Sequence, residues 1–434
     1  MTTHTLTVTD NRTGQSFEVP IADEPSEYAA IRASDLVDPF ATANGPGLVI
    51  YDPGFRNTAL CTSAITNIHV VPGVLEHRGY PIDDLTEHST FVEVAYLLIH
   101  GELPTTSQLA RWQAELGTRK FVHENVKAFI QGFRYDAHPM AMLAASVGAL
   151  GSFYPDASDI TDAGAREQQV LRLVAKMPTL AAYAFRHGTG KPFVYPSDEL
   201  SYAGNLLSMM FKMSELEYSV DPAIERALDT LLICHADHEQ SAATTAVRAV
   251  GSSQVDPYAA VAAGVYALSG PNRGVADRDT MRMLGEIGTV DRVPAYLETV
   301  KSGDRRLMGF GHWIYRGPDP RVKILRSRLR ELSEVTRLSP LLGIADELSR
   351  ITADDEYFVS RGIYPNVDLY SGLTYETIGI PPEMFGVMFA IARSVGWIAQ
   401  WLEMVLDPEQ LTVRPRQIYT GPPTRAYVPI SDRD

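Results

Sequence analysis

The pattern of hydrophobic and polar positions changes near Pro81. Residues 5–20 alternate Thr, Leu and Val with polar positions around an Asp-Asn turn, which predicts a short β-hairpin. Residues 46–80 contain Gly-Pro turns and β-branched pieces such as Leu48-Val-Ile-Tyr, which predict a few further short strands. Beyond Pro81 the apolar residues recur at helical spacing instead.

The segments after Pro81 are rich in Ala, Leu and Met and are separated by Pro or Gly, which is typical of helices. The most apolar of them is interrupted by Arg393, Gln400 and Glu403. The predicted helices cover residues 91–99, 139–153, 170–185, 200–211, 222–234, 257–268, 277–300, 322–335, 339–354 and 385–406.

These patterns predict a mainly α, two-domain helical fold with a short N-terminal β region. The segments between residues 277 and 354 are more charged than the others, as in a smaller and more exposed domain. The expected divisions are a β-rich segment at 1–80, a large helical domain at 81–275, a small domain at 276–380, and a return to the large domain with a C-terminal arm at 381–434.

Composition and charge narrow the class of partner. The chain has 434 residues, of which 45% are hydrophobic and 21% charged, and its formal net charge is −15. This balance argues against nucleic acid or an anionic membrane as a partner but allows small anions bound by a local arginine cluster. Cys61 and Cys234 are the only cysteines, so a disulfide framework is excluded. The sequence shows no export signal and no uninterrupted apolar run of 18 residues, so we expect a cytoplasmic protein.

One glycine-rich stretch, residues 306–321, combines features of an anion site. Gly309 and Gly311 bracket Phe310, so the backbone can approach a ligand closely. His312 follows directly, and Arg321 stands behind an Asp-Pro turn. A titratable donor beside a bidentate cation suits a small carboxylate. A polar surface loop is the alternative interpretation.

A second cluster, His235-Ala-Asp-His238-Glu239, closes a buried-looking helix. Histidines three apart beside carboxylates can hold a metal, although the order is not His-Glu-x-x-His and no third ligand is close in sequence. A histidine that caps its own helix and a histidine that binds a ligand are the other interpretations. We expect no metal.

Further candidates lie near the C-terminus. Asp368 stands in an apolar, aromatic segment, where a carboxylate either caps a turn or acts as a tuned base. Arg393 lies within an apolar helix and therefore needs an anionic partner. Arg414 and Arg416 lie in the tail, where they can reach a cleft or a second subunit or remain solvated. Together these residues suit binding of a di- or tricarboxylate and proton abstraction next to a carbonyl.

The chain resembles the citrate synthase family, and the type II, bacterial kind in particular, from about residue 47 to about residue 421. The resemblance rests on His77-Arg-Gly-Tyr-Pro-Ile-Asp, Tyr96-Leu-Leu-Ile-His-Gly-Glu-Leu-Pro, Lys191-Pro-Phe-Val-Tyr-Pro, Leu200-Ser-Tyr-Ala-Gly-Asn, His235-Ala-Asp-His-Glu-Gln, Gly309-Phe-Gly-His, Asp319-Pro-Arg, Tyr364-Pro-Asn-Val-Asp, Gly396-Trp-Ile-Ala and Arg414-Pro-Arg-Gln-Ile-Tyr-Thr-Gly.

The resemblance implies a small domain that closes over oxaloacetate and acetyl-CoA, a homodimer often assembled into hexamers, and no cofactor besides the acyl-CoA substrate. It implies that Asp368 is the base that removes the thioester α-proton. The residues expected to bind the oxo acid are His238, His312, Arg321, Arg393 and, from the partner subunit, Arg414. Those expected to contact acyl-CoA are Gly309, Phe310, Gly311, Trp313 and Phe389.

The chain departs from the family at its enol-stabilising histidine. The family reads Gly-Pro-x-His-Gly-Gly-Ala-Asn where this chain reads Gly270-Pro-Asn-Arg273-Gly-Val-Ala-Asp277. Arg273 is permanently charged and forked, so it cannot replace a neutral single donor unchanged. Loss of an oxyanion donor typically costs about 10²–10³-fold in rate. Trp313, Gln400 and Ser241 are further departures within the family's motifs.

Three functions follow as hypotheses. The first is a citrate-synthase-type acyltransferase that condenses an acyl-CoA with a 2-oxo acid, with altered donor chemistry involving Arg273 and a place in specialised metabolism. The second is thioester hydrolysis or citrate cleavage on the same scaffold. The third is a non-catalytic paralogue that binds a carboxylate.

Overall fold

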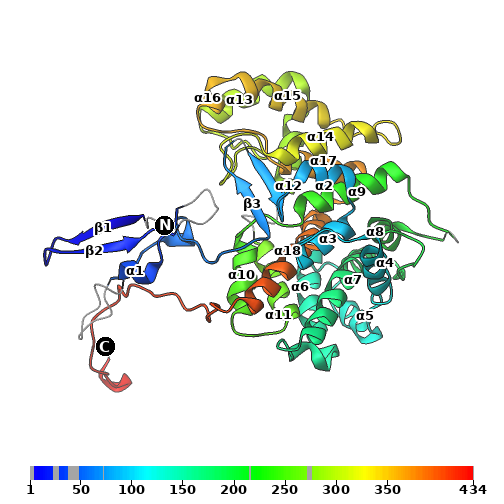
Figure 1. Ribbon diagram of the computed structural model, residues 1–434. Coiled ribbons are helices and arrows are strands. Elements are labelled where there is room, and N and C mark those ends of the chain that lie inside the picture. The colour runs from blue at the N-terminus through cyan, green and yellow to red at the C-terminus, as the bar shows by residue number, and fades with distance from the viewer. Residues whose placement is uncertain are drawn as a thin grey trace. The chain divides into compact units, whose positions relative to one another are not determined.

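The computed structural model describes residues 4–22, 29–37, 48–71, 73–214, 217–270 and 276–433. Within these residues the chain forms eighteen α-helices and five short strands, which confirms the predicted mainly α fold (Figure 1). The chain divides into two compact units. Unit 1 comprises residues 1–59 and 412–434, and unit 2 comprises residues 60–411.

Unit 1 contains the predicted hairpin. Strands β1 (Thr5–Asp10) and β2 (Gln15–Pro20) pair antiparallel from Thr5 opposite Pro20 to Asp10 opposite Gln15. The short helix α1 (Ala33–Val37) follows. The strand expected at Leu48-Val-Ile-Tyr is wrong. These side chains are exposed and their backbone joins no ladder, so their β-branched character has no half-buried sheet surface to pack on.

Unit 2 begins with a small antiparallel sheet of β3 (Thr66–His69), β4 (Val74–His77) and β5 (Tyr80–Pro81). Helices make up most of the rest. They are α2 (Ile82–His88), α3 (Phe91–His100), α4 (Thr106–Gly117), α5 (Glu124–Gln131), α6 (Pro139–Leu150), α7 (Ala163–Gly188), α8 (Tyr202–Phe211), α9 (Pro222–His235), α10 (Ala242–Gly251), α11 (Pro257–Leu268), α12 (Ala276–Ile287), α13 (Val293–Lys301), α14 (Pro320–Leu332), α15 (Leu342–Asp354), α16 (Glu356–Val359), α17 (Asp368–Thr377) and α18 (Phe385–Leu406).

Helix α18 is the central helix of unit 2. It packs against α3, α7, α9, α10 and α11, and both Trp397 and Trp401 are buried between them. The segment Pro382–Leu406 is long and apolar enough to cross a membrane, but 83% of its most apolar window is buried inside the protein. Its hydrophobicity is therefore accounted for by its place in the core.

Differences from the predicted helices have local causes. Helix α7 begins at Ala163 rather than near residue 170 because the Asp162 side chain accepts a hydrogen bond from the Ala165 amide and caps it. The segment predicted as one helix at 277–300 is divided into α12 and α13 at Gly288, whose φ is +76°. The sequence analysis does not predict helices α1, α2, α4, α5, α10, α16 and α17.

Four packed helices, α9, α12, α14 and α17, position part of the candidate site. Helices α12, α14 and α17 lie side by side, and α14 and α17 also contact α9 (Figure 1). Helix α17 begins at Asp368, α14 has Arg321 in its first turn, and α9 ends at His235. The candidate residues are thus at the ends of packed helices, where backbone groups and side chains are accessible to a ligand.

Candidate active site

A cavity of about 500 Å³ in unit 2 brings most of the predicted site residues together. Its walls come from the segment after α9, the 305–313 loop, the helices α14, α17 and α18, and the ends of α10, α11, α12 and α13. The predicted residues that line it are His238, Gly309, Phe310, Gly311, His312, Trp313, Arg321, Asp368, Phe389 and Arg393.

The glycine-rich loop is bound to the segment that carries Asp368. The Gly311 amide donates to the Tyr364 carbonyl at 2.7 Å, and the Asn366 amide donates to the Gly309 carbonyl at 2.9 Å. The Asn366 side chain adds a bond from Nδ2 to the Gly311 carbonyl at 2.8 Å, while its Oδ1 accepts from the Asp368 amide at 3.0 Å. His312 and Asp368 are therefore positioned by one hydrogen-bonded pair of loops.

Both glycines of this loop have a φ of +76°, which L-residues rarely adopt. At Gly309 a Cβ would also lie 3.0 Å from Thr280 Cγ2 and 3.1 Å from the Leu369 Cα, whereas a Cβ at Gly311 meets nothing within 4 Å. Gly309 is thus required by packing against α17 as well as by its backbone angle.

Arg321 is held by a buried carboxylate. Its Nε and Nη2 donate to the two oxygens of Asp319 at 2.9 and 2.7 Å, and both residues are buried. Asp319 also caps α14 and accepts from the Val367 amide at 3.1 Å, so it fixes the start of α17. Burial acts to raise the pKa of Asp319, but the charge and hydrogen bonds of Arg321 outweigh it and lower this pKa.

Two histidine rings lie edge to face in the cavity wall. The His238 and His312 rings are 5.2 Å apart, and His238 Nε2 lies 3.1 Å from the Tyr315 hydroxyl. His312 Nδ1 accepts from the amides of Ile314 and Tyr315 at 3.0 and 3.3 Å. Because Nδ1 is an acceptor, the proton of a neutral His312 ring is on Nε2, where it can be donated to a ligand oxygen.

His238 is uncharged in the folded protein. Burial is the main reason that its pKa lies well below the usual value, and the positive charges of Arg321 and Arg393 lower it further. A neutral imidazole can donate a hydrogen bond to a carboxylate but contributes no net charge. The positive potential of the cavity therefore comes from the arginines.

Arg393 projects from α18 toward the end of α9. Its Nε donates to the His235 carbonyl at 2.6 Å, and its guanidinium lies 4.6 Å from the centre of the Phe389 ring. The His235 ring is buried against Phe389 at 4.7 Å, and its Nδ1 lies 3.5 Å from the Tyr375 hydroxyl. Of the alternatives for the His235–Glu239 cluster, the structure thus gives His235 a place within the core and puts His238 in the cavity wall.

Helix α18 approaches this cluster closely at Gly396. A Cβ there would meet the Ala236 carbonyl and would lie 2.5 Å from Asp237 Oδ1. The motif Gly396-Trp-Ile-Ala therefore has a packing explanation, since only glycine permits this contact.

Asp368 has a second carboxylate beside it. Asp277, in the first turn of α12, is buried, and burial together with the charge of Asp368 raises its pKa well above the usual value. Ser371 Oγ donates to Asp277 Oδ1 at 2.6 Å. Asp277, Tyr315 and Asn366 were not among the predicted site residues. The only sequence signal for Asp277 was its place in the altered glycine-rich motif.

Two predicted residues are not placed in this cavity. Arg273 lies outside the described residues, which stop at 270 and resume at 276. Arg414 belongs to unit 1 and is exposed there.

Trp313 lines the cavity mouth with 72% of its surface exposed. The described part of the chain holds no group of three or more His, Cys, Asp or Glu side chains that could bind a metal ion.

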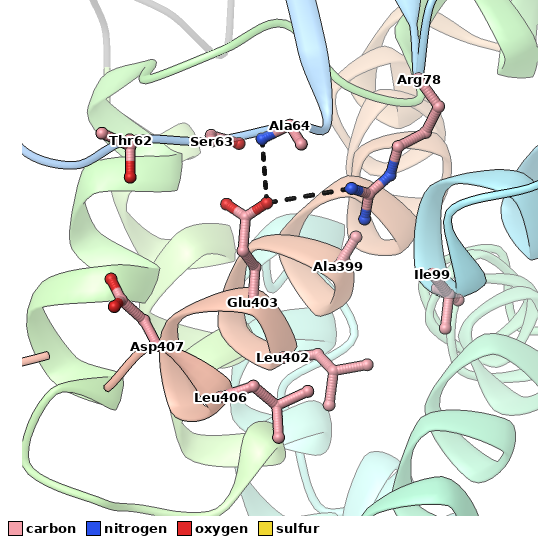
Figure 2. A pocket seen from close by; sticks show the side chains of 10 residues that line it. All are labelled: Thr62, Ser63, Ala64, Arg78, Ile99, Ala399, Leu402, Glu403, Leu406 and Asp407. Carbon is pink, nitrogen blue, oxygen red and sulfur yellow. Dashed lines mark hydrogen bonds and ion pairs between the residues drawn. The ribbon is translucent and has the colours of Figure 1, made fainter. Parts of the chain in front are cut away.

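A second cavity, of about 560 Å³, contains none of the predicted site residues (Figure 2). Figure 2 shows Arg78 and Glu403 pointing toward each other across it, with 3.9 Å between Nη1 and Oε2. Glu403 also accepts from Arg248 at 2.6 Å, and Arg248 donates to Gln400 at 2.8 Å. Gln400, one of the departures from the family pattern, is thus a member of a buried polar network outside the candidate site.

The fold and cavity define a class of protein: a mainly helical scaffold whose interior pocket combines two buried arginines, two neighbouring histidines and the carboxylate of Asp368. The chain belongs to the citrate synthase family, because the family model described as "Citrate synthase, C-terminal domain" matches residues 54–416.

Individual relatives agree with this assignment. The chain is 47% identical to the peroxisomal citrate synthase of Dictyostelium discoideum over 99% of this chain and 88% of that protein. It is 42% identical to the glyoxysomal citrate synthase of Cucurbita maxima over 99% of this chain and 84% of that protein. The structure of citrate synthase from Pyrobaculum aerophilum superposes with a TM-score of 0.82 at 35% identity, covering 88% of this chain and 95% of that chain.

Proposed function

We propose that this protein condenses an acyl-CoA, acetyl-CoA or an analogue, with a 2-oxo acid, oxaloacetate or an analogue. Relatives at 42–47% identity are named citrate synthase. The structural relative from Thermoplasma acidophilum, at 29% identity and a TM-score of 0.79, is described as a ternary complex with carboxymethyl coenzyme A and oxaloacetate. The observation that carries the proposal is the single cavity lined by Asp368, His238, His312, Arg321 and Arg393.

The residues divide the chemistry between them. Asp368 removes a proton from the carbon next to the thioester carbonyl, and the resulting enol or enolate carbon attacks the keto carbon of the oxo acid. His312 Nε2–H and the guanidinium groups of Arg321 and Arg393 stabilise the carboxylates and the negative charge that develops on the keto oxygen. Water then hydrolyses the thioester, which releases the CoA thiol and leaves a tricarboxylate.

Several finer features belong to this proposal. Residues 276–380 act as a small domain that closes over the substrates, with the loop residues Gly309 to Trp313 and Phe389 facing the acyl-CoA. The assembly is a homodimer or hexamer of the type II, bacterial-like kind in which Arg414 binds the oxo acid of the partner subunit. No cofactor besides the acyl-CoA is needed. The cytoplasmic location and a role in specialised metabolism remain predictions, and two of the relatives are named as peroxisomal and glyoxysomal.

Arg273 is proposed to change the donor-site chemistry. A cationic fork favours a full enolate over a neutral enol, or a donor that carries its own carboxylate. A scaffold altered in this way could instead hydrolyse thioesters, cleave citrate or bind a carboxylate without turnover, and the product decides among these functions.

The test is thiol release with acetyl-CoA and oxaloacetate, with products identified by mass spectrometry. The proteins are the wild type, Arg273→His, and Asp368→Asn as the background control. We expect little citrate from the wild type, at least tenfold more from Arg273→His, and none from Asp368→Asn. An ordinary rate of citrate formation by the wild type contradicts the altered chemistry, and activity in Asp368→Asn contradicts the proton-abstraction mechanism. Thiol release without citrate indicates hydrolysis.

A further inference from the structure

Tyr315 contacts both histidines of the cavity and is itself buried, with 1% of its surface exposed. The centre of its ring is 4.6 Å from that of the His312 ring and 5.6 Å from that of the His238 ring. Its amide donates to His312 Nδ1 at 3.3 Å, and its hydroxyl oxygen lies 3.1 Å from His238 Nε2. One residue thus has a polar contact with each imidazole.

The segment that carries Tyr315 is held by the β3–β4 hairpin. The Arg316 amide donates to the Val70 carbonyl at 3.3 Å. Gly73 has a φ of +91°, and a Cβ there would lie 2.8 Å from the Pro318 carbonyl oxygen and 3.9 Å from Tyr315 Cδ1. The hairpin therefore packs directly on this segment and fixes the position of the Tyr315 ring.

The Tyr315 hydroxyl is the donor in its bond with His238. A buried hydroxyl needs an acceptor for its proton, because an orphaned donor is costly. In the part of the chain that the structure describes, His238 Nε2 is the only hydrogen-bond partner of this hydroxyl. Burial also raises the pKa of the Tyr315 phenol, so the phenol keeps its proton over the physiological range. His238 Nε2 therefore accepts a hydrogen bond and carries no proton.

The proton of the neutral His238 ring is then on Nδ1. A neutral imidazole has one N–H, so an acceptor at Nε2 leaves the hydrogen on Nδ1. Among the described residues Nδ1 has no hydrogen-bond partner, and it is not fully buried, unlike the unpaired Nε2 atoms of His77 and His235. Because His238 lines the cavity, this N–H is available to a ligand. His312 presents its Nε2–H in the same way, since its Nδ1 accepts from backbone amides.

We propose that Tyr315 is a positioning residue that sets the tautomer of His238, so that both site histidines present an N–H, and no lone pair, to the 2-oxo acid. This inference deepens the proposed function and rests on it for the identity of the ligand. With Arg321 and Arg393, the cavity then offers hydrogen-bond donors from all four of these side chains. Carboxylate and keto oxygens are acceptors only, so a 2-oxo acid is complementary to this set.

Neutron diffraction tests the tautomer without any turnover. In deuterated crystals of the wild type near neutral pH, we expect deuterium on His238 Nδ1 and none on Nε2. The hydroxyl deuterium of Tyr315 should be directed at Nε2. Deuterium on His238 Nε2, alone or together with Nδ1, overturns the inference, whatever reaction the protein catalyses.

Binding measurements test the consequence for the oxo acid. Calorimetric titration with oxaloacetate compares the wild type with Tyr315→Phe, which keeps the ring and the amide and removes only the hydroxyl. Without that donor the ring proton is no longer confined to Nδ1, so we expect a Kd about tenfold higher. In turnover the KM for the oxo acid should rise by the same factor, while kcat and the KM for acyl-CoA stay within about threefold. An unchanged Kd in Tyr315→Phe, or an equal rise in KM for both substrates, overturns the inference.

The matched control is Tyr258→Phe. Tyr258 is also buried, and its hydroxyl donates to Gln169 Oε1 at 2.9 Å, so the variant loses a bond of the same kind away from the cavity. We expect Tyr258→Phe to bind oxaloacetate as the wild type does. Equal weakening in both variants would be a general effect of removing a buried hydroxyl and would contradict a specific role for Tyr315. If the wild type binds no oxaloacetate, the proposed function fails at its acceptor, and the neutron result alone decides the tautomer.

Discussion

His77, His235 and His238 are three histidines buried in unit 2. Burial lowers the pKa of each of them, to about 3 for His77 and well below the usual value for the other two, and Arg321 and Arg393 lower them further. Of these three, His238 lines the cavity, and its neutral ring supplies a hydrogen-bonding group there without adding positive charge to that of the arginines.

These histidines should make the free energy of unfolding decrease as the pH decreases. Below about pH 6.5 the unfolded chain binds protons on these rings that the folded chain excludes. The free energy of unfolding is therefore highest above that pH and decreases below it. Each histidine adds a slope of up to about 1.4 kcal/mol per pH unit. Urea unfolding at pH 7.5, 6.5 and 5.5 should show this, with a smaller slope for His77→Gln. His88→Gln, at an exposed position, is the control for the His-to-Gln substitution itself. Equal stability at pH 7.5 and 5.5 would contradict the prediction.

The Asp319–Arg321 pair offers a comparison between buried and exposed ion pairs of similar geometry. Asp319→Asn leaves a buried guanidinium without its counter-charge, which typically costs about 3–5 kcal/mol of unfolding free energy. The exposed pair of Arg350 with Glu347, bidentate at 2.8 and 2.7 Å, is the control. Glu347→Gln should leave the urea midpoint unchanged.

The lowered pKa of Asp319 also determines how the stabilisation by this pair changes with pH. Because the net shift lowers the pKa of Asp319, the pair stabilises the fold above the usual Asp pKa of about 4, and this contribution is lost as the pH decreases below it. The difference between wild type and Asp319→Asn should therefore be largest near pH 7. A difference that grows in acid would contradict this account.

Among elements, the pairing of the 309–312 loop with the 364–366 segment does most to shape the site. Gly309 and Gly311 have the same φ of +76°, but only Gly309 is confined by Thr280 and Leu369. Gly311→Ala should therefore lower the free energy of unfolding only by the cost of holding alanine in a left-handed backbone conformation, about 1–2 kcal/mol. Gly309→Ala should lower the free energy of unfolding by clearly more, because α17 must also move. The check is the urea midpoint of both variants, and equal losses would show that packing at Gly309 contributes nothing.

The sequence predicts helices well where one face is apolar or a cap is present, and less well elsewhere. Helix α17 has buried residues on every side, so it shows no helical period, although its first residue, Asp368, was recognised from its apolar surroundings. The contact of Ser371 with Asp277 joins residues 94 positions apart, and a contact of that kind depends on helix packing that no local pattern encodes. The bridge from Asn366 to Gly311, 55 positions away, has the same cause, whereas the cap that Asp319 forms on α14 is a local Asp-Pro signal that the sequence analysis interpreted only as a turn.

At the scale of the whole molecule, Arg414 and the cavity belong to different compact units. If Arg414 serves the partner subunit, two inactive variants should complement each other. A hybrid dimer of Arg414→Ala and Asp368→Asn has one site with both defects and one site with neither. Random mixing of the two chains should restore about a quarter of wild-type activity.

The controls for this mixing experiment are the two variants alone, which should remain inactive at the same total concentration. No recovery after unfolding and refolding them together would show that Arg414 acts within its own chain or not at all.

The distribution of tryptophans gives the protein a built-in optical probe. Of its four indoles, Trp112, Trp397 and Trp401 are buried, whereas Trp313 is exposed next to His312 at the cavity mouth. A dissolved quencher such as acrylamide should reach Trp313 far more readily than the other three. Selective quenching should therefore decrease when an acyl-CoA covers the mouth and disappear in Trp313→Phe. Ligand occupancy could then be followed by fluorescence in the unlabelled protein, with no turnover required.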